Sequence, residues 1–251
     1  MIKGKTKYII LFSLFLILIS ASLVSASSVD EVMSKWNKSE VYRESGGASL
    51  TIGITYYSAE YIEALVQDEA EKNLWTKDET ENYKYNLLQT LNIEETLPFH
   101  VYIKNIGPGL HLAPFGDQLT LWAGDKKLKP VDYDKRFNFK VTGEREGLVY
   151  FPRYDENGRS VLEGVKSIRL VFYNGISPAT MGKTVDFIWD VYKDDPQRLY
   201  AGQAGAKLEI DRLIKRVQKL ETQKNDLEAQ LAEVNADLAE INARIEELRS
   251  Q

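Results

Sequence analysis

A coiled-coil heptad repeat occupies the end of the chain and determines much of its architecture. From Ile210 to Leu248, apolar side chains recur at alternating steps of three and four, interrupted only by Lys224. The a positions of this repeat are Ile210, Val217, Lys224, Leu231, Leu238 and Ile245, and the d positions are Leu213, Leu220, Leu227, Val234, Ile241 and Leu248. A lone straight helix cannot bury such a stripe, so the sequence predicts a coiled-coil helix over residues 210–248, roughly 60 Å long.

The partner of this helix is predicted to be a second copy of the chain, as a dimer or trimer, or another coiled-coil protein. Lys224 at an a position costs stability and fixes the register. In a parallel pair in register, Arg216 would face Glu221 favourably, whereas Arg244 would face Arg249. The charges therefore leave the dimer and the trimer open.

A row of alanines lies on the helix face away from the seam. Its members, again spaced by three and four, are Ala229, Ala232, Ala236, Ala239 and Ala243. Alanine is the best helix former, so a solvated helix of high propensity explains the row. The alternative hypothesis is a second close-packing face, through which the helices would bundle into a larger assembly.

Residues 1–26 have the composition of a secretory signal peptide. Three lysines precede an apolar run that relaxes into small residues ending at Ala26, which is the order that the export machinery and signal peptidase recognise. Cleavage is predicted after Ala26. The alternative is an uncleaved anchor, because residues 8–26 are just long enough to span a bilayer.

Charge and cysteine content narrow the partners and the compartment. The formal charge is −5 and becomes −8 without the signal peptide, so no excess of cations supports a nucleic-acid partner. The chain has no Cys, which excludes disulfides, thiol nucleophiles and cysteine metal sites. An exported protein without disulfides is predicted to be periplasmic or extracellular and bacterial.

The middle of the chain alternates apolar and polar residues with the period of a β-strand. The predicted strands are 50–57, 99–104, 119–122, 137–142, 148–151, 168–172 and 185–191. Asn157-Gly158 is a pair that suits a two-residue hairpin turn after the 148–151 strand. About seven strands separated by turn residues predict a mainly β fold with some α, an immunoglobulin-like antiparallel β-sandwich.

Two helices are predicted between the first two strands, as an insertion over residues 58–92. Ser58 can cap the first helix, and Thr76 with Glu79 forms a capping box for the second. The predicted organisation is a short helix and linker at 27–47, the sandwich at 48–195 and the C-terminal helix at 196–251. Gly202 and Gly205 suggest a bend before the coiled coil.

Catalytic chemistry has little support in the sequence. The motifs of metalloproteases, nucleophile elbows, phosphate loops and dinucleotide sites are absent, and His100 and His111 fall on a polar strand phase and in a loop. Acidic pairs such as Asp132 with Asp134, or Asp194 with Asp195, could serve as glycosidase acids or calcium ligands. The stretch from Asp155 to Gly158 does not follow the spacing of a calcium loop. No cofactor or metal is predicted.

The predicted function is that of an exported, non-enzymatic interaction protein, which oligomerises through its coiled coil and presents a binding surface at the cell envelope. The partner on that surface is an envelope glycan or protein. Trp75 and Trp122 are the candidate exposed aromatics, since tryptophan stacks on sugars and anchors protein contacts. The alternative is a carbohydrate-binding or glycan-acting secreted protein that uses these residues and loop carboxylates.

Overall fold

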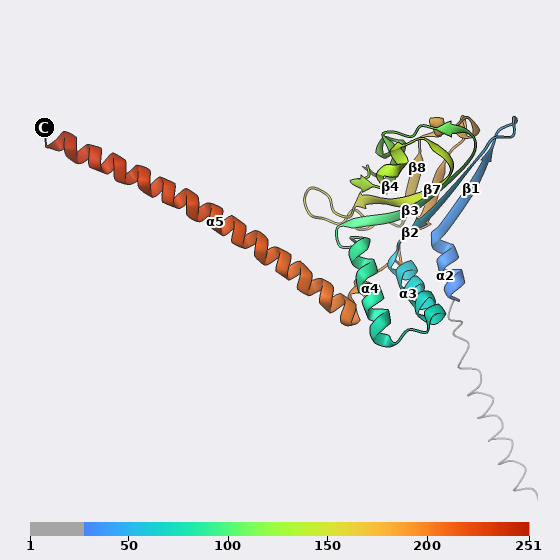
Figure 1. The fold of residues 1–251 in the computed structure, drawn as a ribbon, viewed down its shortest axis with the longest axis horizontal. Coiled ribbons are helices and arrows are strands. Elements are labelled where there is room, and N and C mark those ends of the chain that lie inside the picture. The colour runs from blue at the N-terminus through green and yellow to red at the C-terminus, as the bar shows by residue number, and fades with distance from the viewer. Residues whose placement is uncertain (1–27, 251) are drawn as a thin grey trace, which may run out of the picture.

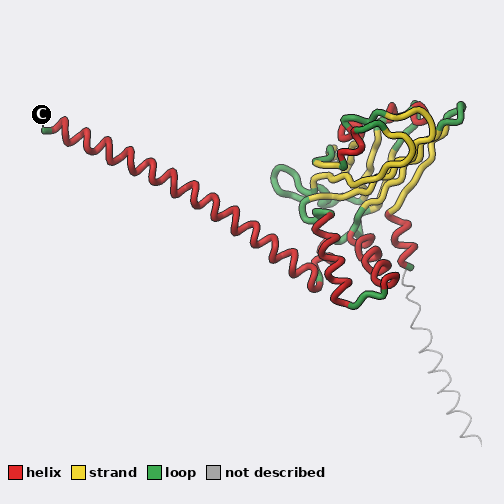
Figure 2. Tube along the Cα trace, in the orientation of Figure 1, coloured by secondary structure: helices red, strands yellow, loops and turns green. Residues whose placement is uncertain are grey.

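The computed structural model describes residues 28–250, which form two antiparallel sheets, three helices at one end of the sheets and a long C-terminal helix (Figure 1; Figure 2). The five-stranded sheet has the order β1 (Asn37–Arg43), β2 (Ser49–Tyr56), β3 (Thr96–Leu110), β7 (Val141–Pro152) and β6 (Asp132–Tyr133). The four-stranded sheet has the order β5 (Lys126–Leu128), β4 (Leu119–Ala123), β8 (Ser167–Phe172) and β9 (Asp186–Asp190). Antiparallel sheets followed by a long helix are therefore confirmed, and the immunoglobulin-like arrangement stays a prediction.

One apolar core is shared by the two sheets. Phe99 of β3 and Trp189 of β9 lie with ring centroids 5.5 Å apart, and both are buried. Tyr56 of β2 packs against the same two rings. These side chains come from both sheets, so residues of the two sheets contribute to the same buried apolar cluster.

The predicted helical insertion forms α3 (Ala59–Asn73) and α4 (Lys77–Thr90). Ser58 caps α3 by accepting from the Tyr61 amide, and Thr76 and Glu79 make the reciprocal bonds of a capping box on α4. Local polar chemistry thus sets the start of both helices, as the sequence indicates.

The linker predicted within residues 27–47 is wrong for most of its length. The short helix is present as α2 (Val29–Trp36), but Asn37–Arg43 forms β1, which pairs with β2. Its side chains are mostly exposed, because β1 is an edge strand, and this gives the segment the polar composition of a linker. Trp36, buried at the junction, donates its indole N–H to Glu60 at 3.0 Å.

The strand predicted over residues 137–142 is also wrong. Lys135–Asn138 is a 3-10 helix that buries Phe137 against Phe115, whereas Phe139 is 67% exposed. Strand β7 begins only at Val141. A single buried aromatic ring satisfies either conformation, so the apolar alternation was misleading here.

The turn at Gly158 closes a longer loop than predicted. Asp155 and Arg159 are paired through a main-chain hydrogen bond of 2.9 Å, and Tyr154 and Ser160 form an isolated bridge. Gly158 has φ of +75°. A three-residue loop with a left-handed glycine therefore replaces the two-residue turn.

The C-terminal helix α5 (Gly202–Arg249) follows a 3-10 turn, η5 (Pro196–Tyr200). The predicted bend ends at Gly202, and Gly205 is helical. A Cβ at Gly205 would lie 2.0 Å from the Tyr200 carbonyl oxygen. Gly205 is thus required for close packing between the helix and the preceding turn, which the sequence alone does not distinguish from flexibility.

Candidate functional site

The first turns of α5 are bound to α4. Leu208 is buried in a small apolar cluster that also contains residues of α3 and α4, and Ala204 is buried one turn before it. The amide of Ala204 donates to Glu81 at 2.8 Å, and Asp211 accepts a hydrogen bond from Tyr85. The base of the long helix is therefore fixed to the body by apolar packing and by polar contacts.

Beyond this base, α5 extends away from the rest of the molecule as an isolated rod (Figure 1). The eleven apolar seam residues are between 41% exposed, at Ile245, and 64% exposed, at Leu227. Ile214 is exposed beside them at an e position and widens the apolar surface near the base. Twelve exposed large apolar side chains of the described chain therefore lie on α5, and a contiguous exposed apolar surface of this kind is typical of interaction sites.

The seam points away from the body at the point where the rod leaves it. Ala204 and Leu208 define the side of α5 that packs on the body. Because successive residues turn by about 100° around a helix, Ile210 and Val217 fall on the opposite side. A second helix can therefore cover the seam from its base without meeting the body of the same chain.

Lys224 lies in the middle of this stripe. Its ammonium is 3.5 Å from Glu228 of the same helix, and both side chains are exposed. Leu220, Leu227 and Leu231 surround it and form a shallow apolar hollow of about 340 Å³. The lysine thus interrupts the apolar seam, and the leucines around it stay accessible to a partner helix, as expected for a polar residue at an a position.

The alanine row is fully accessible on the rod. All of its members lie in the exposed part of α5, and the described chain places no other element on this face. The structure is compatible with a solvated helix face and with a second packing face.

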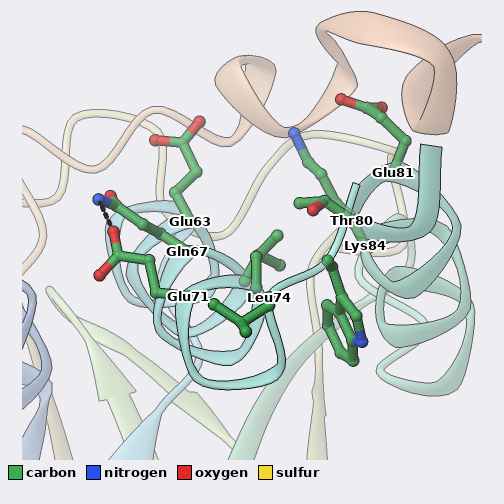
Figure 3. Close-up of a pocket in the computed structure, with 10 residues that line it drawn as sticks. Glu63, Gln67, Glu71, Leu74, Thr80, Glu81 and Lys84 are labelled. Carbon is green, nitrogen blue, oxygen red and sulfur yellow. Dashed lines mark hydrogen bonds between the residues drawn. The ribbon is translucent and has the colours of Figure 1, made fainter. Parts of the chain in front are cut away.

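A second candidate surface is an open groove between the end of α3 and the start of α4 (Figure 3). Its volume is about 620 Å³, and Val66, Ala70, Leu74 and Trp75 supply its apolar part. Leu74 is 88% exposed and has a left-handed backbone, with φ of +54°. An exposed leucine in this conformation is uncommon, because the left-handed region favours glycine.

Polar side chains rim this groove, and most of them already have partners. Glu63 pairs with Arg198 at 2.6 Å, Glu71 accepts from Gln67 at 2.8 Å, and Glu81 caps α5. Figure 3 shows Gln67 and Glu71 bonded to each other beside the groove. The groove therefore offers apolar contact more than free charge.

The two candidate tryptophans lie in different settings. Trp75 is half-buried in the groove and packs on Tyr83 with ring centroids 4.8 Å apart. Trp122 is half-buried on β4, with Lys127 and Arg169 each 5.9 Å from its ring. Trp75 belongs to the helical insertion and Trp122 to the four-stranded sheet, so the two do not form one aromatic platform on a single element.

The candidate loop acids have structural partners. Asp132 pairs with Lys135 and Asp134 with Arg136, and these hydrogen bonds lower the pKa of both carboxyls. Asp155 accepts the amides of its own turn, chiefly that of Arg159, which lowers its pKa. Within residues 28–250, no group of three or more metal-ligating side chains occurs.

Asp194 differs from the other acids because it is largely buried. Its Oδ1 accepts the amide of Ala59 at 2.8 Å, at the start of α3, and Tyr56 Oη is 3.5 Å from its other oxygen. Burial raises the pKa of Asp194, and the backbone hydrogen bonds oppose that effect. Asp195 caps the next turn by accepting the Gln197 amide, so these neighbours face different partners and do not act as a pair.

The two histidines lie in different settings in the described chain. His100 is half-buried on β3, with Nε2 3.5 Å from Glu146 at the surface. His111 is exposed in the loop after β3. The polar strand phase and the loop position predicted for them are where the structure places them.

Sequence reasoning missed the contacts that orient the rod. Tyr85, Asp211 and Glu81 are polar residues on helix surfaces, and nothing in their local sequence distinguishes them from solvated neighbours. Leu208 precedes the seam, and its apolar character was the one available signal. The apolar spacing places Leu74 on the inner face of α3, whereas it ends the helix and is exposed.

Comparisons with known proteins identify no family. No protein-family model matches the chain, and no curated protein matches it. Among solved structures, it is similar to a novel protein of unknown function from Burkholderia pseudomallei K96243. That similarity has 9% identity and a TM-score of 0.36 over 70% of this chain and 86% of the other, and it is too weak to indicate a fold or a function.

No helix within residues 28–250 combines the length and the apolar character needed to cross a bilayer. The predicted signal peptide or anchor, residues 1–26, lies outside the described residues.

Proposed function

We propose that the protein is an exported, non-enzymatic interaction protein that assembles through its C-terminal coiled coil and displays its strand-rich body in several copies at the cell envelope. The observation that carries the proposal is the seam of α5, which is apolar except at Lys224 and is covered by nothing in the described chain. Export rests on the sequence of residues 1–26.

The energetics favour assembly over an isolated rod. Covering a half-exposed aliphatic side chain gains about 1 kcal/mol, so eleven from each of two helices contribute on the order of 20 kcal/mol. Association costs about 4–15 kcal/mol in lost freedom. The gain exceeds the cost even though Lys224 weakens one layer, and the seam therefore favours a partner helix.

The body is proposed to be an immunoglobulin-like sandwich that serves as the displayed unit. The packing of Phe99 on Trp189 across the two sheets supports face-to-face sheets. Display in several copies raises effective affinity for a repeated partner, such as an envelope glycan or protein, by roughly 10²- to 10⁴-fold without new contacts.

The test is the solution mass of residues 27–251 over a hundredfold range of concentration. A stable dimer or trimer is expected. Residues 27–195, which lack the helix, are expected to be monomeric. A monomer of residues 27–251 at the highest concentration would refute assembly through the seam, and pull-down with the helix would then show whether a foreign partner replaces the second copy.

A carbohydrate-binding body is the second candidate, and the position of Trp75 in an open groove supports it. A glycan array on residues 27–251 tests it, with Trp75→Ala and Trp122→Ala as variants. Loss of a glycan signal with Trp75→Ala alone would place the site in the groove. A glycan-acting enzyme has weaker support, since the candidate acids are held in ion pairs and caps.

A further inference from the structure

The connection between α3 and α4 carries an apolar tip whose composition resembles that of membrane-interface residues. Leu74 is 88% exposed, and Trp75 follows it with part of its ring accessible. Lys72 and Lys77 flank the pair. Tryptophan is enriched at the boundary between lipid headgroups and acyl chains, with lysines reaching outward to the headgroups.

The backbone at this tip carries a cost that the fold does not explain. Leu74 adopts φ of +54° as the C-cap of α3, where glycine is the usual residue. A residue with a Cβ loses about 1 kcal/mol or more in this conformation. An apolar side chain is therefore held in water, on a strained backbone, at a position that a glycine would fill better.

The tip lies at the end of the body where α2 begins. Lys35, at the end of α2, pairs with Glu60, at the start of α3, so the two helices run in opposite directions. Asp30, near the start of α2, lies close enough to contribute to the raised pKa of Lys72, which Asp68 chiefly causes. Figure 1 shows the start of α2 and the α3–α4 connection at the same end of the body, with α5 leading away from it.

The chain that precedes α2 indicates what covers this tip. The apolar stretch of residues 8–26 ends two residues before Ser28, the N-cap of α2. In the uncleaved-anchor alternative, which replaces cleavage after Ala26, this stretch stays in the bilayer and only Ser27 separates it from the N-cap of α2. The end of the body that bears Leu74 and Trp75 is then held against the lipid surface.

We propose that residues 8–26 are retained as a membrane anchor and that Leu74 and Trp75 form a lipid-contacting tip, which enters the interface of the same membrane. The contact is apolar in origin. The surrounding charges do not favour an anionic surface, because Asp68, Glu69, Glu71, Asp78 and Glu79 outnumber the two lysines. The tip therefore prefers zwitterionic lipid. This inference goes beyond assembly through the coiled coil and does not depend on it.

The absence of cysteine makes a site-specific test direct. Lys77→Cys, beside the tip, and Ser45→Cys, in the turn between β1 and β2, each carry one environment-sensitive fluorophore on full-length protein in phosphatidylcholine vesicles. A lipid-borne quencher is expected to remove most of the emission at position 77 and little at position 45. Equal quenching at both positions, or none at position 77, would overturn the proposal, as would failure of the full-length chain to float with vesicles.

Two further arms separate apolar insertion from charge-driven docking and from mere proximity to the bilayer. Leu74→Gly with Trp75→Ser, in the Lys77→Cys protein, is expected to halve the quenching or more while flotation and thermal stability are kept, since glycine suits the backbone of position 74. Unchanged quenching would show that the tip does not make the contact. Replacing part of the lipid with phosphatidylglycerol is expected to leave quenching unchanged or lower it, and a severalfold increase would mean charge-driven docking and refute the apolar tip.

Discussion

Asp211 of α5 accepts a hydrogen bond from the hydroxyl of Tyr85 on α4, a residue 126 positions earlier in the chain. Gln89 of α4 donates to the same carboxylate at 2.8 Å. With Leu208 buried one turn before, these contacts set the direction in which the rod leaves the body. This direction turns the seam away from the body, as the proposed assembly through the seam requires.

Weakening the contacts at the base of α5 is expected to let the helix change its direction relative to the body without unfolding the body. Leu208→Ala leaves a cavity in the small cluster and costs about 2–4 kcal/mol locally, and Tyr85→Phe removes one hydrogen bond to Asp211. Amides of residues 202–211 are expected to exchange with solvent faster in the double variant, while those of β3 and β7 keep their protection. Gln218→Ala, exposed on the same helix, is the control. Equal loss of protection in the strands would show that the base and the body unfold together.

Charges placed in the seam are expected to dissociate the assembly. Leu231→Lys with Leu238→Lys puts two ammonium groups into adjacent a layers and removes apolar burial worth about 1 kcal/mol for each half-exposed side chain. The measured mass of the mature chain is expected to fall to that of a monomer at micromolar concentration.

The alanine row supplies the matched control for that experiment. Ala236→Lys with Ala239→Lys adds the same charge on the outer face of the same helix, where all of these alanines are exposed. An unchanged mass fits a solvated face. A lower mass would instead establish the second packing face.

Replacing the polar residue of the seam is expected to strengthen the assembly. Lys224→Leu extends the apolar stripe through its one interruption and gains about 1 kcal/mol per chain when a partner covers the half-exposed side chain. The unfolding temperature of the helix should rise, and mixed oligomeric states should appear, because a polar a position restricts them. Lys219→Leu, at an outer position, is the control. An unchanged unfolding temperature would place Lys224 outside the buried layers.

The parts of the fold that the sequence predicted depend on local chemistry. The caps made by Ser58 and by Thr76 with Glu79, and the spacing of the seam, follow from residues within one or two helical turns of each other. The parts that the sequence predicted wrongly depend on partners that are distant in the chain. Asn37–Arg43 looks polar because β1 is an edge strand, and Phe137 is buried by Phe115 in a 3-10 turn, where a strand would bury it equally well.

The candidate site divides in the same way. The helix with its exposed apolar stripe was predictable because its period lies within the local sequence. The contact of Asp211 with Tyr85 was not, because it requires two distant helices to meet. The exposure of Leu74 depends on where α3 ends, and helix ends are the least predictable feature of a sequence.

The indole of Trp189 is expected to stabilise the junction between the core and the N-terminal helix. Its N–H donates to the carbonyl of Trp36 at 2.9 Å, and both rings are buried. Trp189→Phe leaves that carbonyl unpaired and a small cavity beside it, with an expected loss of about 2–4 kcal/mol in the free energy of unfolding. Denaturant unfolding measures the loss, with Trp122→Phe at the surface as control. A loss of unfolding free energy smaller than that of the control would mean that a water molecule replaces the hydrogen bond to the Trp36 carbonyl.

Asp194 is expected to make stability depend on pH in the direction opposite to that of a salt-bridged acid. Burial raises its pKa above the ordinary value of 3.8, so the folded protein binds the proton more tightly than the unfolded chain does. The stability that this carboxyl contributes is complete below the unfolded pKa and is lost as pH rises through the folded pKa.

Asp194→Asn keeps an oxygen that can accept the Ala59 amide and removes the buried charge. The unfolding temperature of the variant should therefore rise relative to that of the wild type as pH rises from about 3.5 to 7. Asp195→Asn controls for the loss of one carboxylate. The opposite result would be an unfolding temperature of the wild type that rises relative to that of Asp194→Asn over this pH range. It would show that the hydrogen bonds from the start of α3 outweigh burial and that the fold stabilises the charged carboxylate.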